Sequence, residues 1–381
     1  MGRTVRQVVL SGYYGFRNSG DEAVLQSILL ALQAEGERAG VAIEPVVLSI
    51  DPAWTERMYG VKAVHRMKLG EVLSAIRQSD GLISGGGSLL QDATGKLTIP
   101  YYLGILKLAQ WLGKPTFIYS QGIGPVGRKV FFGPIRRTFA RSAYVSVRDK
   151  ESAELLKRMG LRRPAEIVPD PVMGLPLRTS APAEEAAVAG HEEQAERVGS
   201  LPVIGVSVRF WNEDRSELAA LADALKQIRR ERAVEVRFLP FHLPDDEEAS
   251  REVIRRMCAE DAPDVRIAGG LDHPQAMLAA VGECSLLIGM RLHSLIYAAS
   301  QQVPVAGISY DPKIDQFLAR LKRTAVASTE RMDAGVIARE SLLLLDSREA
   351  WTRTAGPLID TLKSEAHRPA ERIVELLAKK G

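Results

Sequence analysis

Arg291 and His293 stand directly after an apolar run, residues 284–288, that is typical of a buried strand. The residues that follow His293 have a helical pattern. We therefore expect both side chains at the carboxyl end of a strand and the start of a helix, where open α/β sheets bind ligands and helix ends favour anions. Lys313 follows the next predicted strand, residues 303–308, and returns to the same sheet edge. Three cationic or titratable groups at one edge indicate a small, highly charged, anionic substrate.

Two further arginines follow predicted strands. Arg148 comes after residues 144–147 and precedes a helix, and Arg209 comes after residues 203–208. A planar guanidinium suits bidentate capture of a carboxylate or phosphate. An ion pair, for Arg148 with Asp149, is the ordinary role of an isolated arginine. The sequence leaves both interpretations open for each arginine.

Three glycine-rich segments follow predicted strands of the first half. They are Ser11–Ala23, Ser84–Asp92 and Ser120–Pro125. Glycines let backbone amides approach a ligand closely, and a helix start adds partial positive charge. A tight turn explains any one segment alone, but three at one sheet edge favour a binding site. Gln91, Asp92 and Gln121 would then hold sugar hydroxyls.

Several established motifs are absent from the sequence. There is no G-x-G-x-x-G, H-E-x-x-H or G-x-S-x-G pattern, and the two cysteines, Cys258 and Cys284, lack metal-ligand spacing. Hydrolysis by a bound metal and acyl transfer through a serine are therefore disfavoured, and no metal site is expected.

The composition is that of a globular intracellular protein. The 381 residues are 46% hydrophobic and 25% charged, with a formal net charge of +3, which gives no indication of a nucleic-acid partner. Two cysteines fit a reducing compartment. No apolar segment reaches the ~20 residues of a membrane span, and no secretory signal precedes the first strand. We expect a cytoplasmic protein.

Alternating strand and helix patterns predict two α/β domains with mostly parallel sheets. The predicted strands are 5–10, 43–49, 81–84, 116–119, 144–147, 203–208, 234–239, 265–267, 285–288 and 305–308, and the predicted helices of the first half are 21–33, 99–112 and 149–159. A segment rich in Ala, Glu and Gly separates the two series. We divide the chain into an N-terminal Rossmann-like domain (1–178), a linker (179–200) and a C-terminal Rossmann-like domain (201–381), with an interdomain cleft as the expected site.

Taken together, these segments resemble the polysaccharide pyruvyl transferase family, and most closely its bacterial CsaB type. The matching stretches occur in family order across nearly the whole chain. They are Gly15–Ala23, Gly85–Gly87, Gln121–Pro125, Ser146–Asp149, Arg291–Ser294 and Tyr310–Lys313.

The resemblance implies a glycosyltransferase-B-like fold of two facing domains. It implies phosphoenolpyruvate as donor, with no further cofactor, and a sugar hydroxyl pair as acceptor. The product would be a pyruvate ketal on N-acetylmannosamine in an undecaprenyl-diphosphate-linked oligosaccharide, a secondary cell-wall polymer precursor. Such ketals help to anchor S-layer proteins. The enzyme would work at the inner face of the cell membrane.

The chemistry of phosphoenolpyruvate as donor suggests a role for each candidate residue. Phosphoenolpyruvate carries a carboxylate and a phosphate, so Arg148 and Lys313 would neutralise these groups with help from Arg291. His293 is the candidate general acid, because a nearby phosphate would keep it protonated. Asp21 or Asp92 would be the base. The candidate acceptor-binding residues are Tyr14, Phe16, Asn18, Asp21, Gly86, Gln91, Asp92 and Gln121.

Two stretches mix apolar and basic residues and are candidates for membrane contact. Residues 101–107 and 129–137 are also explained as helices packed on the sheet, and the second is the better candidate for anionic lipid. Two other functions fit parts of the pattern. A glycosyltransferase of the same fold would use a nucleotide sugar, and a non-catalytic protein would bind the lipid-linked glycan without releasing phosphate.

Overall fold

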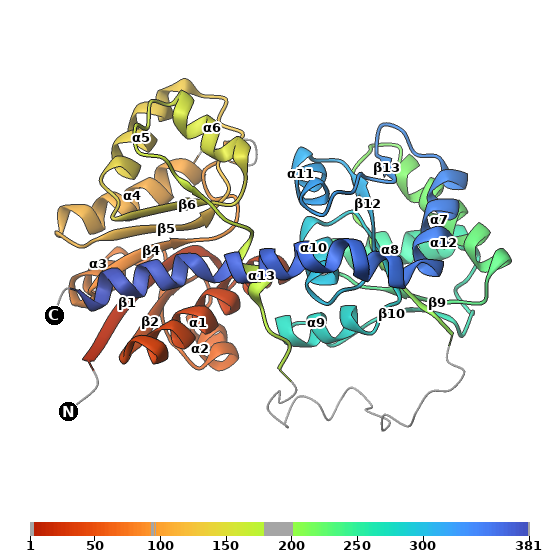
Figure 1. Cartoon of the computed structure of the whole chain (residues 1–381), viewed down its shortest axis with the longest axis horizontal. Helices are drawn as coiled ribbons and strands as arrows, with labels where there is room; N and C mark the ends of the chain where they lie inside the picture. Colours follow the sequence, from red (N-terminus) through yellow and green to blue (C-terminus); the bar gives the residue numbers. More distant parts are fainter. Residues whose placement is uncertain (1–3, 93–94, 96, 179–200, 380–381) are drawn as a thin grey trace. The chain divides into compact units, whose positions relative to one another are not determined.

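Parallel sheets form the framework of the computed structural model, which describes residues 4–92, 95, 97–178 and 201–379 (Figure 1). Contacts divide the described residues into two units. The first comprises the residues up to Arg17, Asp21–Leu175 and the residues from Leu362 onwards; the second comprises Asn18–Gly20 and the described part of Pro176–Thr361. The predicted linker, 179–200, lies outside the described residues.

The first unit has a seven-stranded sheet in the order β3-β2-β1-β4-β5-β6-β7, and every pairing is parallel. Its strands are β1 (Thr4–Tyr14), β2 (Val41–Ser49), β3 (Lys62–His65), β4 (Gly81–Gly85), β5 (Thr116–Gln121), β6 (Tyr144–Val147) and β7 (Glu166–Ile167). Its helices are α1 (Ser19–Ala39), α2 (Pro52–Tyr59), α3 (Leu69–Gln78), α4 (Thr98–Trp111), α5 (Phe132–Ala140) and α6 (Lys150–Arg158), with short 3-10 turns at Lys129–Phe131 and Pro171–Gly174.

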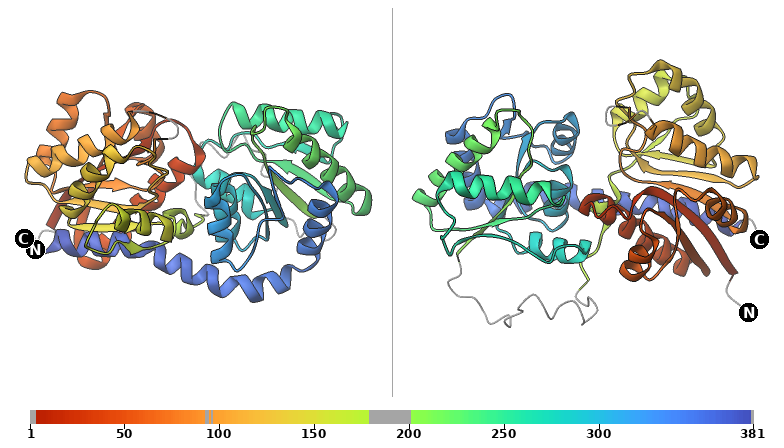
Figure 2. Two further views of the ribbon diagram at one scale, coloured as in Figure 1. Left: turned by 90° about the horizontal axis from the view of Figure 1, so that it is seen from above. Right: turned by 180° about the vertical axis from the view of Figure 1, so that it is seen from behind.

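Apolar side chains cover both faces of this sheet. Val9, Leu82 and Ile118 point to one face, where they pack against residues of α3 to α6. Burial on both faces explains why central strands such as β4 are continuous apolar runs. Figures 1 and 2 show α4 and α5 on one side of the sheet and α1 on the other.

The first strand is longer than predicted. We expected it to end at Leu10, with a loop from Ser11, but β1 continues to Tyr14, which pairs with Ser49. The Tyr14 hydroxyl donates to the carbonyl of Gly85 (3.0 Å). A buried tyrosine needs such a partner, and the contact holds the strand extension in place. The glycine-rich connection therefore begins at Gly15.

The second unit has a six-stranded parallel sheet in the order β10-β9-β8-β11-β12-β13. Its strands are β8 (Val203–Ser207), β9 (Glu235–Phe238), β10 (Val265–Ile267), β11 (Leu286–Gly289), β12 (Val305–Ser309) and β13 (Ala327–Ser328). Its helices are α7 (Ser216–Glu231), α8 (Asp245–Met257), α9 (Pro274–Gly282), α10 (Leu292–Ser300), α11 (Pro312–Arg320) and α12 (Ala334–Asp346). Residues of α7, α8 and α12 bury one face of the sheet. The predicted fold class, two α/β domains with parallel sheets, is confirmed.

The last helix, α13 (Arg348–Ala378), begins in the second unit, and its residues from Leu362 belong to the first. In the first unit the carbonyl of Leu377 accepts a hydrogen bond from Arg6 (3.1 Å).

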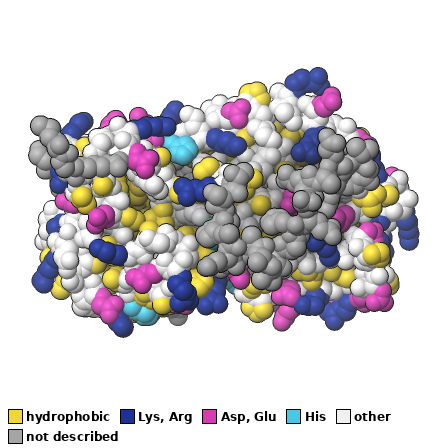
Figure 3. Space-filling model, turned by 90° about the horizontal axis from the view of Figure 1, so that it is seen from below, with side chains coloured by type: hydrophobic (Ala, Val, Ile, Leu, Met, Phe, Trp, Pro, Cys, Tyr) yellow, Lys and Arg dark blue, Asp and Glu magenta, His cyan; other side chains and the backbone are white. Residues whose placement is uncertain are grey.

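Among the described residues, no helix combines the length and apolar character needed to cross a bilayer. On the face drawn in Figure 3, basic and acidic side chains are interspersed rather than gathered into a field of one sign.

Candidate functional site

The carboxyl ends of β1, β4, β5 and β6 share one edge of the first sheet because the strands are parallel. Gly86 and Gly87 follow β4 with φ values of 59° and 68°, in the left-handed region that favours glycine. A β-carbon on Gly87 would lie 3.1 Å from a carboxylate oxygen of Asp21, at the start of α1. This loop therefore brings its backbone close to an acidic side chain.

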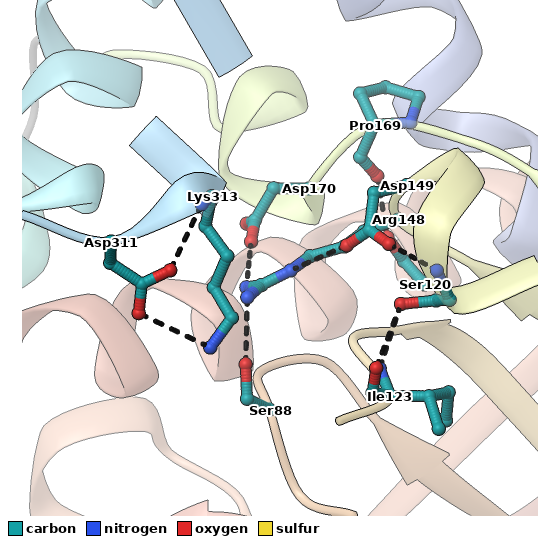
Figure 4. A network of polar contacts seen from close by, with 10 residues as sticks. Ser88, Ser120, Ile123, Arg148, Asp149, Pro169, Asp170, Asp311 and Lys313 are labelled. Carbon is teal, nitrogen blue, oxygen red and sulfur yellow. Dashed lines mark hydrogen bonds and ion pairs between the residues drawn. The ribbon is translucent and has the colours of Figure 1, made fainter. Parts of the chain in front are cut away.

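Arg148 lies directly after β6 and is 8% exposed. Its Nη2 donates to the hydroxyl of Ser88 (2.7 Å), and its Nη1 donates to Asp170 (3.4 Å), as Figure 4 shows. Its Nε lies 3.6 Å from Asp149, so the ion pair considered from sequence is present. A β-carbon on Gly122 would stand 2.9 Å from that Nε, so the glycine leaves room for the guanidinium. Asp170 could not be recognised as a partner from sequence, because it lies 22 residues away from Arg148.

Asp21 is partly buried beside this cluster. Burial raises its pKa to about 7, reinforced by the charges of Glu22 and Asp170 and opposed by Arg148. A carboxyl group with a pKa near neutrality can accept and release a proton at physiological pH. Of the residues predicted as bases, Asp21 has the electrostatic surroundings that the role requires.

The neighbouring Glu22 holds the first glycine loop. Its carboxylate accepts hydrogen bonds from the Gly15 amide (2.8 Å) and the Tyr59 hydroxyl (2.9 Å). Burial nevertheless raises its pKa to about 7. The pKa values of two adjacent carboxyl groups are thus raised to near neutrality, and the charge of Glu22 contributes to the shift of Asp21.

Asp92, the other predicted base, is in a different environment. Its carboxylate accepts the amides of Gly127 (2.8 Å) and Arg128 (2.9 Å), and these hydrogen bonds lower its pKa. Ionised and hydrogen-bonded in this way, Asp92 fixes the loop after β5. Of the two predicted bases, Asp21 is the one whose pKa is raised.

The remaining acceptor-side candidates occupy varied positions. Tyr14 lies in the core. Gln121 is also buried, and its Oε1 accepts a hydrogen bond from the Ser84 hydroxyl (3.2 Å). Both side chains therefore support the glycine loops from the interior of the unit. Gln91 is partly exposed. Phe16 is 36% exposed and stacks on Tyr13 with ring centroids 3.9 Å apart.

Asn18 belongs to the second unit by its contacts, together with Ser19 and Gly20. It forms a β-bridge with His242, and the Ser19 amide donates to the carbonyl of Phe241 (3.1 Å). The Tyr297 hydroxyl donates to the carbonyl of Ser19 (3.2 Å). These bonds fix the three-residue segment on the second unit.

His293 lies in the first turn of α10 and packs on Gly20, where any β-carbon would overlap the imidazole ring. Arg291, the residue before this helix, forms an ion pair with buried Asp246 through two contacts, one of them 3.0 Å from Nε to Oδ2. Asp246 also accepts the amides of Phe241 and His242. Arg291 is thus held within the fold, and its nearest electrostatic partner is a protein carboxylate.

Lys313 lies in the first turn of α11. Asp311 caps this helix by accepting the Lys313 amide (3.0 Å), and the Lys313 Nζ lies 3.7 Å from the same carboxylate (Figure 4). The contact is loose, because it exceeds an ordinary hydrogen-bond distance. The second unit therefore presents an imidazole and an ammonium at the starts of two neighbouring helices. Within the described parts of the chain, no group of three or more His, Cys, Asp or Glu side chains could hold a metal ion.

The fold is similar to that of UDP-GlcNAc 2-epimerases and of a glycosyltransferase. The UDP-GlcNAc 2-epimerase of Methanocaldococcus jannaschii has a TM-score of 0.62 at 13% identity, covering 99% of this chain and 100% of the other. The UDP-GlcNAc 2-epimerase of Neisseria meningitidis, bound to UDP-GlcNAc, has a TM-score of 0.60 at 11% identity, covering 99% and 100%. A glycosyltransferase from Rickettsia africae has a TM-score of 0.60 at 10% identity, covering 100% of both chains. At these identities the likeness concerns the glycosyltransferase-B-like fold alone.

A comparison with curated proteins gave no match. The family model for polysaccharide pyruvyl transferase matches residues 18–312, which include the glycine loops after β4 and β5, Arg148, Arg291 and His293. This match covers well over half of the chain, so the chain belongs to the polysaccharide pyruvyl transferase family.

Proposed function

We propose that this protein transfers the pyruvyl group of phosphoenolpyruvate to two hydroxyls of one sugar, forming a cyclic ketal and releasing phosphate. Family membership supports pyruvyl transfer. The observation that carries the mechanism is Asp21, a carboxyl group with a pKa of about 7, beside the buried guanidinium of Arg148. That pairing supplies a base near neutral pH and a cation for an anionic donor.

The reaction needs one proton donor and one proton acceptor. His293 protonates the methylene carbon of phosphoenolpyruvate, which leaves an oxocarbenium-like centre at the carbon bearing the phosphate. A sugar hydroxyl bonds to that centre and gives its proton to Asp21. As the C–O bond to phosphate breaks, the departing phosphate takes up the proton held by Asp21, so that Asp21 is ionised again. The second hydroxyl then attacks the same carbon to close the ketal, and its proton restores His293. Arg148 and Lys313 stabilise the carboxylate and the departing phosphate.

The acceptor in this proposal is an N-acetylmannosamine unit of a lipid-diphosphate-linked cell-wall glycan, as for the CsaB type. Such an acceptor is met at a membrane surface. Arg136 and Arg137 are exposed on α5, and Val130, in the 3-10 turn before this helix, is 74% exposed. These residues support peripheral contact with anionic lipid. Co-sedimentation with phosphatidylglycerol vesicles should fall at least severalfold after charge reversal of both arginines; equal binding would remove this part of the proposal.

Phosphate release from phosphoenolpyruvate, with and without a synthetic lipid-diphosphate disaccharide ending in N-acetylmannosamine, tests the reaction. Acceptor-dependent release and a matching pyruvyl mass gain on the glycan are expected. If phosphoenolpyruvate raises the melting temperature but no phosphate is released, phosphoenolpyruvate remains the proposed donor and the proposed acceptor is wrong. Protection by a nucleotide sugar instead of phosphoenolpyruvate would replace the proposal with glycosyl transfer.

The role of His293 is tested separately by His293→Gln. A general acid is needed at every turnover, so kcat at saturating phosphoenolpyruvate should fall by about 10²- to 10⁴-fold. A higher KM for phosphoenolpyruvate with unchanged kcat would instead mean that His293 only binds the donor.

A further inference from the structure

Arg209 lies two residues after β8, at the carboxyl edge of the second sheet. Its guanidinium carbon stands 5.3 Å from the ring centroid of Trp211 and 4.9 Å from that of Tyr310. Its Nη1 donates to the Tyr310 hydroxyl (3.0 Å), and its Nε donates to the carbonyl of Phe210 (3.3 Å). Aromatic rings and neutral oxygens therefore fix the orientation of this cation.

The charge of Arg209 is not neutralised within the part of the chain that the structure describes, where no carboxylate oxygen lies within 4.0 Å of its guanidinium nitrogens. The other three cations predicted for the site each lie near a carboxylate. Arg148 lies beside Asp149 and Asp170, as described above. Arg291 pairs with Asp246, and Lys313 lies beside Asp311. A partly buried, oriented guanidinium without a carboxylate is suited to an anion from outside the protein.

The loop that carries Trp211 is anchored by a buried acid. The carboxylate of Glu217 accepts the amides of Trp211 (2.9 Å) and Asn212 (3.3 Å), and the Asn212 side chain donates to the carbonyl of Thr329 (3.1 Å). The Trp211 side chain nevertheless remains 48% exposed. A fixed backbone that displays an open aromatic side chain is typical of a preformed binding surface.

We propose that Arg209 binds the carboxylate of phosphoenolpyruvate, an inference that rests on the proposed function. One Nη1 proton and both Nη2 protons remain to form a fork, which matches the two oxygens of a planar carboxylate. Tyr310, which orients the fork, lies three residues before Lys313. A lysine is a point charge without a fork, so Lys313 suits the phosphate of the same molecule. The flat faces of Trp211 and Tyr310 flank the guanidinium and limit its contact with water.

Tryptophan fluorescence provides a binding assay that does not depend on turnover. Trp211 is one of four tryptophans and lies against Arg209, so titration with phosphoenolpyruvate should change its emission, and Trp211→Phe should remove that change. In Arg209→Gln, the Kd for phosphoenolpyruvate should rise by about 10- to 100-fold, as expected for loss of charge-assisted hydrogen bonds. The Kd for inorganic phosphate, measured by competition or calorimetry, should change by less than about threefold.

Arg323→Gln is a matched control, because Arg323 stands 5.1 Å from the ring centroid of Trp351 in the same unit and the substitution removes the same charge. Its affinity for phosphoenolpyruvate should equal that of the wild type. Arg209→Lys keeps the positive charge but lacks the fork, so it should bind phosphoenolpyruvate at least about tenfold more weakly than the wild type does. This variant replaces Arg209→Gln in the test if the glutamine variant fails to fold.

Two outcomes separate the inference from the proposed function. Equal affinity of wild type and the Arg209 variants for phosphoenolpyruvate would overturn the inference and leave the transfer reaction standing. An equal loss of affinity for phosphate and phosphoenolpyruvate would overturn the assignment to the carboxylate. Failure of the wild type to bind phosphoenolpyruvate at all would overturn the proposed function and the inference with it.

Discussion

Replacement of Asp21 by asparagine should make the protein more stable at alkaline pH while it slows phosphate release. The pKa of Asp21 is raised from 3.8 to about 7, so the folded protein holds a proton there that the unfolded chain has lost. As pH rises from about 4 to about 7, this difference lowers the free energy of unfolding of the wild type. Asparagine resembles the protonated acid and has no such dependence.

The raised pKa sets the size of the effect. At about 1.4 kcal/mol for each pH unit, the interval from 3.8 to about 7 corresponds to about 4 kcal/mol. Asp21→Asn should therefore match the wild type in free energy of unfolding near pH 4 and exceed it by up to about 4 kcal/mol at pH 9. The pKa of about 7 already includes the opposing charge of Arg148, so about 4 kcal/mol is the net effect of the surroundings of Asp21.

Urea unfolding of wild type and variant at pH 4.5, 6, 7.5 and 9 measures the difference. Asp92→Asn is the matched control, because backbone hydrogen bonds lower the pKa of Asp92, so its variant should be destabilised above about pH 4. Phosphate release by Asp21→Asn should fall by about 10²- to 10⁴-fold. A variant that is no more stable than wild type at pH 9 would refute the electrostatic account of Asp21.

Three further predictions concern residues that position the site. Gly20→Ala should reduce kcat by at least about tenfold, because its β-carbon would displace the His293 imidazole; unchanged kinetics would show that the ring tolerates the shift. Asp246→Ala should lower the free energy of unfolding by about 3 to 5 kcal/mol, since it leaves the Arg291 guanidinium without its partner; urea unfolding would test this, with a loss below about 1 kcal/mol counting against it. Gly87→Ala should cost about 1 to 2 kcal/mol in urea unfolding, because alanine disfavours a φ of 68°, and stability equal to wild type would contradict that strain.

The candidate site residues could be named from sequence, but their partners could not. Motif spacing indicated Arg148, Arg291 and His293, yet nothing local distinguished their electrostatic states. Arg291 is paired with Asp246, 45 residues earlier, and it was expected to contact the donor. Arg209 was ambiguous in sequence, and only its surroundings, two aromatic rings and no acid among the described residues, favour an anion-binding role.

Short elements were also beyond prediction. The strands β3 and β7 have four and two residues, too few for a period of alternating burial to be recognised. The extension of β1 to Tyr14 depends on Ser49 and Gly85, which the chain supplies from β2 and β4.

Local pattern by itself determined the two parallel sheets, the glycine loops at strand ends and the family, because apolar periodicity and motif spacing are properties of neighbouring residues. Only the tertiary structure decided which carboxylates neutralise which cations and which acid stays protonated near neutral pH. Those outcomes depend on burial and on Coulomb interactions, whose strength is set by distances between loops far apart in the sequence.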